Sequence, residues 1–325
     1  MKTAYWHLRL LRSFLLLALA LSLGCPMMSR KETKKEKEIP DAEAQAQKEK
    51  EIDDLFKGKD ADELPRIYFD KGIQTKDDPT GRFVLLRKAR DAAAEQLDHD
   101  RAFAAIDELA KSFDDVDALE MKKDVMLRMA RAAKSTDHFF DLTNDALKLI
   151  DECLEADKYE AVNALLDLAD DTRKKVKTAE DMKDLQANVE VKRREVREME
   201  KEFEGVKAAR DTLESKPDDK DANLTWGKFV CTMKGNWDKG LPMMEKGSDK
   251  DLALIAKTDL DKPTNGDEQV KLGDKWWELA QPEQGLNREN LKARAVYWYK
   301  KAESSVAGLT QERIKKNIRE VERKE

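Results

Sequence analysis

Few side chains in this sequence could carry out acid–base, nucleophilic or metal chemistry. Beyond the first 24 residues the histidines are His99 and His138, and each is isolated in the sequence. There is no HExxH or CxxC motif, no Cys/His cluster and no glycine-rich phosphate loop. Ser248, in KGSDKD, lacks both a nucleophile-elbow motif and an evident base. We therefore expect no catalytic residue, no metal site and no cofactor.

The most suggestive acidic cluster is Asp218, Asp219, Asp221 and Asn223, which superficially resembles a calcium loop. Leu224 stands where such a loop requires glycine, and the closing acidic ligand is missing. The cluster precedes a helical pattern, so the sequence favours N-capping of that helix. A glycosidase-type pair of carboxylates stays open as an alternative, because its members can lie far apart along the chain.

Aromatic side chains are the other candidates for binding chemistry. Most of the tryptophans lie after residue 225: Trp226, Trp237, Trp276, Trp277 and Trp298. One interpretation is an aromatic groove for a sugar or a peptide. The alternative is packing between helices.

The composition indicates helices that each bury one apolar stripe. Hydrophobic residues make up 40% of the 325 residues, charged residues another 40% and aromatic residues 6%. The 8 prolines and 13 glycines are too few for an all-β protein rich in tight turns. The sequence therefore predicts an all-α fold.

The first 24 residues indicate export. Lys2, Arg9 and Arg12 precede the apolar stretch SFLLLALALSL, which is too short to span a bilayer. Cleavage can follow the small-residue sequence ALA, or LSLGC can act as a lipobox that makes Cys25 a lipidated N-terminus, although its leucine stands one place late. An uncleaved anchor is the third route. We expect a periplasmic or cell-envelope protein, and lipidation of Cys25 would attach it to a membrane.

Residues 25–64 include RKETKKEKE and QAQKEKE and have almost no apolar periodicity, so we expect a charged flexible tether. Residues 65–178 show helical spacing and predict hairpins, with helices near 82–97, 103–113, 116–133, 137–155 and 157–176. Cys153 and Cys231 fall in helical apolar patterns. Two separate buried thiols are favoured over a disulfide between them.

Residues 179–216 predict one long amphipathic helix. From Met182, alternate steps of three and four meet an apolar residue at eight of ten positions, with Lys192 and Arg210 as the exceptions. Such a seam can form a coiled-coil homodimer. The favoured alternative is that the helix packs on its own domain, because the seam is short and carries two charges.

Residues 217–325 contain an internal repeat with a shift of 46 residues. Pro217 aligns with Pro263 and Gly227 with Gly273. A glycine in mid-helix costs up to about 1 kcal/mol relative to alanine, so we expect another helix to pass close to each. The second helices share a small–bulky–small pattern, formed by Gly240, Met244 and Gly247 in one copy and by Ala295, Tyr299 and Ala302 in the other.

The ten-residue offset from proline to glycine and the pattern of the second helices resemble tetratricopeptide and Sel1-like repeats. Both copies are longer than those repeats, because 249–260 adds a helix and 281–288 lengthens a turn. The segments RFVLLRKARDAA, KGNWDKGLPMMEKGSD, KLGDKWWELA and ARAVYWYKKA also resemble a group of uncharacterised exported proteins of planctomycete bacteria. That resemblance implies an exported helical-repeat protein, a stacked α-solenoid, and no activity.

In the resembled repeats the concave face holds extended peptides, and here Trp277, Asp274, Glu278 and Lys228 would line that face. We therefore expect a non-catalytic scaffold that binds an unidentified protein or peptide. The acidic net charge, −6 for the whole chain, disfavours nucleic acid as a partner. The alternative is a carbohydrate-binding or carbohydrate-cleaving envelope protein that uses the tryptophans.

Overall fold

The computed structural model describes residues 38–323, and fourteen helices with no β-strand make up its regular structure. The predicted all-α fold of stacked helical hairpins is confirmed. The predicted signal peptide (1–24) and the lipidation site Cys25 lie outside the described residues. None of the helices in the described range is both long enough and apolar enough to span a bilayer.

The described chain divides after Val196 into two compact units, here called the N-terminal unit (38–196) and the C-terminal unit (197–323). This division lies inside the long helix α9 (Ala179–Ser215), whereas the sequence predicted boundaries near residues 178 and 216. The long helix therefore belongs in part to each unit.

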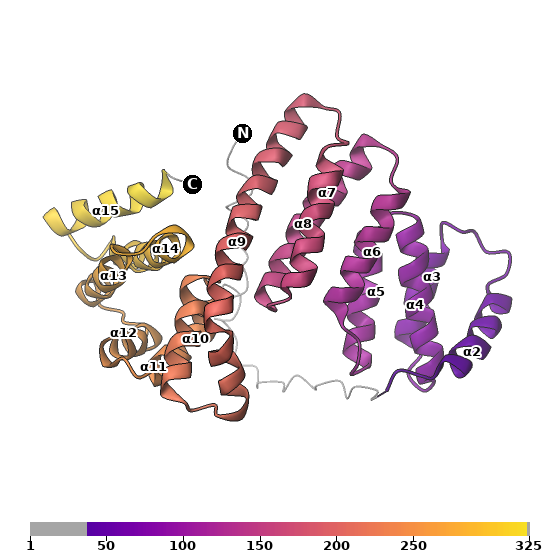
Figure 1. Cartoon of the computed structure of the whole chain (residues 1–325), viewed down its shortest axis with the longest axis horizontal. Helices are drawn as coiled ribbons and strands as arrows, with labels where there is room; N and C mark the ends of the chain where they lie inside the picture. Colours follow the sequence, from indigo (N-terminus) through magenta and orange to yellow (C-terminus); the bar gives the residue numbers. More distant parts are fainter. Residues whose placement is uncertain (1–37, 324–325) are drawn as a thin grey trace. The chain divides into compact units, whose positions relative to one another are not determined.

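In the N-terminal unit the successive helices α3 to α8 pack against one another, from the pair α3–α4 through to the pair α7–α8 (Figure 1). Contacts also join α4 with α6 and α6 with α8, so the hairpins stack. The helices have these bounds: α2 Ala42–Leu55, α3 Leu64–Gln74, α4 Pro79–Glu95, α5 His99–Ser112, α6 Ala118–Ala132, α7 Thr136–Glu155 and α8 Tyr159–Arg173.

Local capping chemistry explains where these helices begin. Asp78, Asp98, Asp117 and Ser135 each accept a hydrogen bond from the backbone N–H three residues ahead, at the starts of α4 to α7. Such a cap satisfies one of the four N–H groups that a helix start leaves without an intrahelical partner. The hairpins predicted between residues 82 and 155 are therefore found at nearly the expected positions.

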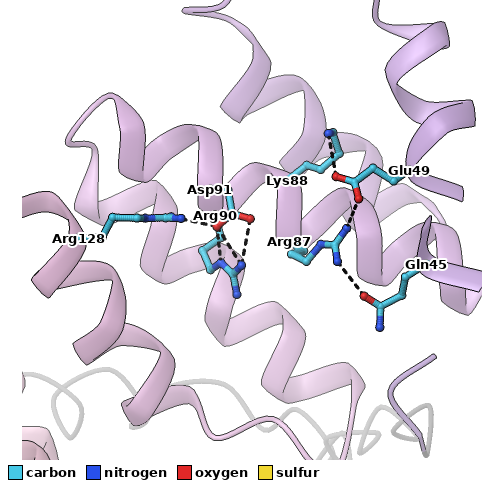
Figure 2. Close-up of polar contacts among 7 residues, drawn as sticks. All are labelled: Gln45, Glu49, Arg87, Lys88, Arg90, Asp91 and Arg128. Atoms are coloured by element: carbon cyan, nitrogen blue, oxygen red, sulfur yellow. Dashed lines mark hydrogen bonds and ion pairs between the residues drawn. The ribbon is translucent and has the colours of Figure 1, made fainter. Parts of the chain in front are cut away.

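Residues 42–55 correct the prediction of a flexible tether at 25–64, because they form α2, which packs on α4. Arg87 of α4 donates to Gln45 at 2.8 Å and to Glu49 at 2.7 Å, and Lys88 contacts Glu49 at 3.3 Å (Figure 2). Ile52 is the one α2 residue that is buried. Apolar periodicity fails to reveal this helix because its docking depends mainly on charge.

The C-terminal unit contains the second part of α9 and six further helices. The helix pairs α10–α11 and α13–α14 correspond to the two predicted repeats, and α12 is the additional helix expected at 249–260. The bounds are α10 Lys220–Thr232, α11 Trp237–Lys246, α12 Lys250–Leu260, α13 Gly266–Ala280, α14 Gly285–Ala302 and α15 Gly308–Glu322.

Equivalent side-chain contacts recur at the 46-residue shift. Asn223 donates its amide N–H to the Pro217 carbonyl at 2.8 Å, and Gln269 does the same to the Pro263 carbonyl at 2.8 Å. Asp219 belongs to the acidic cluster that superficially resembles a calcium loop. It is the N-cap of α10 and accepts a hydrogen bond from the Ala222 N–H. N-capping was therefore the correct interpretation of that acidic cluster.

The mid-helix glycines lie where a second helix passes close by, as predicted. A Cβ atom added at Gly227 would lie 2.9 Å from the backbone nitrogen of Met244. A Cβ at Gly273 would lie 2.6 Å from the Tyr299 ring. Met244 and Tyr299 are the bulky residues of the small–bulky–small pattern, so both repeats pack in the same way.

The heptad seam of α9 is used for packing within the chain. Leu185, Val189, Val196, Met199 and Phe203 are each at most 5% exposed. The seam's two charges are also accommodated: Lys192 pairs with Asp151 of α7 at 2.6 Å, and the Arg210 guanidinium lies 5.1 Å from the centre of the Phe203 ring. This burial favours the alternative that the helix packs on its own chain, and the homodimer stays a prediction.

Cys153 and Cys231 are free, buried thiols. Burial raises the pKa of Cys153 to about 11 and raises that of Cys231 as well. Because only the thiolate reacts, we expect iodoacetamide at pH 8 to label both cysteines at least ~100-fold more slowly in the native chain than in urea. Peptide mass mapping would read each thiol separately. Rapid labelling of Cys153 in the native chain would contradict this expectation.

Candidate ligand-binding cleft

A cleft of about 430 Å³ lies among the helices of the C-terminal unit. This volume lies within the range of about 300–1,000 Å³ that is typical of ligand sites. Its walls come from the second part of α9, from one face of α10 and from α11 to α14. The apolar lining residues are Val206, Leu224, Phe229, Met233, Met244, Leu252, Trp276, Leu279 and Leu291.

The Trp276 wall of the cleft is held by a buried carboxylate. Asp259 of α12 has a fully buried side chain, and its Oδ2 accepts from the indole nitrogens of Trp276 at 2.7 Å and Trp298 at 2.8 Å. Arg294 of α14 donates its Nε to the same oxygen at 3.0 Å and its Nη2 to Oδ1. Asp259 thus ties α12 to both helices of the second repeat.

Aromatic rings surround the Arg294 guanidinium. Its central carbon lies 4.7 Å from the ring centre of Tyr297, 5.1 Å from that of Trp237 and 5.9 Å from that of Trp298. A cation over aromatic faces gains attraction that increases with desolvation. The Arg294 guanidinium is therefore neutralised by Asp259 and enclosed by aromatic rings. These contacts hold Arg294, Trp298 and Trp276 in place next to the cleft.

Asp259 and Arg294 were not among the residues predicted from the sequence to be functional. The available signal was local: Asp259 follows Leu252 and Ala256 at helical spacing, so a carboxylate occupies a position on an apolar stripe. A buried carboxylate requires a cationic or hydrogen-bonding partner. The identity of that partner, 35 residues further along the chain, came only from the structure.

Three charged side chains at the cleft have no ion-pair partner among the described residues: Glu202 of α9, Lys228 of α10 and Glu283 of the turn before α14. Glu202 and Lys228 are exposed, and Glu283 is half-buried. Glu198 accepts from Leu286 N–H at 3.1 Å, which joins α9 to the start of α14. Glu202 is one helical turn further along α9, and Glu283 lies just before the start of α14.

The four predicted contact residues do not form one site, since Lys228 lines the cleft and the other three do not. Asp274 accepts from the Tyr299 hydroxyl at 2.8 Å and from Arg313 of α15 at 2.6 and 2.9 Å. Lys292 lies 4.5 Å from the ring centre of Trp277, which is half-buried. Glu278 is exposed and pairs with Lys275 at 3.1 Å.

The Tyr299 hydroxyl is a stable donor to Asp274. Burial raises the pKa of Tyr299 above its ordinary value, and the hydrogen bond to Asp274 raises it further. The phenol therefore stays protonated at neutral pH. The predicted open face at Asp274 is instead occupied by Arg313, which α15 supplies.

The five tryptophans of the C-terminal unit all pack in or against its core, but they differ in how far their side chains are buried. Trp226, Trp276 and Trp298 are at most 7% exposed. Trp237 and Trp277 are half-buried and pack against the same core cluster, and the rings of Trp237 and Trp276 meet at 5.1 Å. None of the five is among the exposed large hydrophobic side chains of the described chain.

Within residues 38–323, no group of three or more His, Cys, Asp and Glu side chains is arranged to hold a metal ion. His99 of α5 contacts Asp100 of the same helix and Asp145 of α7, each at 3.1 Å. Comparisons with protein-family models, with curated proteins and with solved structures found no match.

Proposed function

We propose that this protein is a non-catalytic, helical-repeat binding protein of the cell envelope, and that the cleft of the C-terminal unit holds a short segment of a partner protein. One observation carries the proposal: the cleft combines an apolar lining with charged side chains that have no partner among the described residues. Binding sites commonly pair an apolar floor with a few polar groups that orient the ligand.

The charges indicate which segment would fit. Glu202 and Glu283 contribute two carboxylates to the lining of the cleft, and Lys228 contributes one ammonium group from α10. The balance is one negative charge, so a basic side chain next to a large apolar one complements the cleft better than an acidic side chain does. The proposed ligand is therefore a peptide segment in which leucine or phenylalanine is flanked by lysine or arginine.

The burial of the tryptophans supports a protein partner over the carbohydrate alternative. Sugar sites stack their ligand on exposed aromatic faces, whereas the five tryptophans here lie in or against the core. Export rests on the sequence of residues 1–24, and attachment to a membrane through Cys25 rests on the lipobox-like sequence. Both belong to the proposal.

Peptide titration tests the proposal. We expect a fluorescein-labelled peptide with the repeat Lys-Leu-Lys to bind at least ~10-fold more tightly than its Glu-Leu-Glu counterpart, because only the former complements Glu202 and Glu283. With methyl-labelled methionine, the NMR signals of Met233 and Met244, which line the cleft, should shift on binding. Those of Met126 and Met129, buried in the N-terminal unit, should not.

Two substitutions on α9 provide the matched control. Glu202→Lys places a positive charge at the cleft and should weaken binding of the basic peptide at least ~5-fold, whereas Glu204→Lys makes the same charge change at an exposed residue that does not line the cleft. Equal weakening by both substitutions would show a non-specific charge effect. If glycan fragments and no peptide moved the Met233 and Met244 signals, the carbohydrate alternative would replace this proposal.

A further inference from the structure

The face of α4 that carries Arg87 and Lys88 is covered by α2, and the contacts between the two helices are mainly ionic (Figure 2). Glu49 bridges Arg87 at 2.7 Å and Lys88 at 3.3 Å, and Asp53 pairs with Lys88 at 2.7 Å. The carboxylates of Glu49 and Asp53 are four residues apart, so both point to the same side of α2. The Arg87–Lys88 face of α4 is therefore covered by the acidic side of a helix.

The apolar part of the contact is small. Ile52 is 4% exposed and joins Tyr68, Val84, Leu85 and Ala89 in one core cluster, with Phe56 partly buried beside it. Phe56 meets the Tyr68 ring edge-on at 5.4 Å. Leu55, by contrast, is 74% exposed. One aliphatic side chain and one aromatic ring thus anchor a helix of fourteen residues.

Two physical arguments make α2 displaceable. A helix of this length is marginal in water by itself, so its order depends on docking. Its ion pairs are partly open to solvent, with Asp53 54% and Glu49 39% exposed, so salt screens them. The helices behind it, α4 and α5, bury many more apolar residues and do not share this weakness.

We propose that the Arg87–Lys88 face of α4 is a binding surface for an acidic amphipathic helix of a partner protein, and that α2 is its resident, displaceable occupant. The structure specifies the partner's pattern through α2 itself: two carboxylates four residues apart, as at Glu49 and Asp53, with an aliphatic residue just before the second, as at Ile52. The proposal is independent of the cleft in the C-terminal unit.

The test uses the full chain and a fluorescein-labelled peptide of residues 41–57, which carries that pattern. In the Glu49→Lys/Asp53→Lys chain the resident helix repels Arg87 and Lys88. We expect this chain to bind the peptide at least ~10-fold more tightly than the wild-type chain does, because its surface is vacated. The Glu43→Lys/Asp54→Lys chain has the same net charge, but both changes are at exposed residues of α2 that make no ion pair with Arg87 or Lys88, so it should behave as the wild type.

Charge reversal of the receptor supplies the specificity control. The Arg87→Glu/Lys88→Glu chain should reject the peptide and accept a peptide that carries Glu49→Lys and Asp53→Lys. If the loosened chain keeps its helical circular dichroism and still fails to bind the peptide, the proposal is wrong.

Hydrogen exchange of the wild-type chain gives a second test that needs no variant. Amides of α2 should exchange faster than those of α4, and their exchange should accelerate when salt is raised from 0.01 to 1 M, over which the Debye length falls from about 30 to about 3 Å. Exchange of α2 at the rate of α4 at every salt concentration would show that α2 is an integral part of the core and would overturn the proposal.

Discussion

Replacing Asp259 with alanine is expected to lower the free energy of unfolding of the C-terminal unit by about 3–5 kcal/mol. The substitution leaves the Arg294 charge without its carboxylate and removes the acceptor of two indole N–H groups, those of Trp276 and Trp298. Each of these donors is buried or nearly so, with the Arg294 side chain 14% exposed. Leaving buried donors unpaired costs more than the hydrogen bonds contribute when formed.

Urea unfolding followed by tryptophan fluorescence measures this effect on the C-terminal unit alone, because residues 38–196 contain no tryptophan. Asp261→Ala is the matched control, since Asp261 is exposed at the end of the same helix and should change stability by no more than about 0.5 kcal/mol. Adding Arg294→Met to Asp259→Ala should recover part of the loss by removing the unpaired charge. A loss below about 1 kcal/mol for Asp259→Ala would mean that water reaches this site.

Two glycine-to-alanine substitutions should change the stability of the same unit in opposite directions. At Gly240 a Cβ atom would lie 2.8 Å from the carbonyl oxygen of Gly227 and 2.9 Å from the backbone nitrogen of Cys231. Backbone atoms cannot rotate away, so α10 and α11 must separate, and we expect a loss of about 1–3 kcal/mol. Gly205 lies in α9 with nothing within 4 Å, so alanine there should gain up to about 1 kcal/mol of helix propensity.

The same fluorescence assay reports both substitutions, because both residues belong to the C-terminal unit. Gly227→Ala is a second test of the close helix approach, since its Cβ would meet Met243 and Met244 at 2.9 Å. It should resemble Gly240→Ala. Tolerance of alanine at Gly240 without loss of stability would contradict the close contact between α10 and α11.

Helix positions in this protein could be predicted because their causes are local. The long helix spans Ala179–Ser215, within one residue of the predicted 179–216, and the hairpins between residues 82 and 155 follow their apolar spacing and their Asp or Ser caps. The repeat was also visible in the sequence, because equivalent packing demands the same small residue at Gly227 and Gly273. These features depend on neighbours within a few residues or on an internal copy.

The missed helix at residues 42–55 lacks an apolar stripe, since Ile52 is its one buried residue. Residues 42–55 look like a charged tether, and only the basic residues of α4 explain why they form a helix. Helix α15 was not anticipated either, and it changes the surroundings of Asp274 by supplying Arg313. The effect of a charged side chain depends on the charges that lie near it in space. Those neighbours can be distant in the sequence and cannot be read from it.

The sequence by itself determined the all-α fold and the repeat, because periodicity and capping act over short stretches of chain, and the leader pattern is the basis of the export that we propose. The tertiary structure alone decided that Lys228 lines a cleft, that Asp274 is engaged by Tyr299 and Arg313, and that Asp259 holds the core of the second repeat. Whether a polar side chain faces a cleft or pairs with partners in the interior depends on contacts between residues that are distant in the chain.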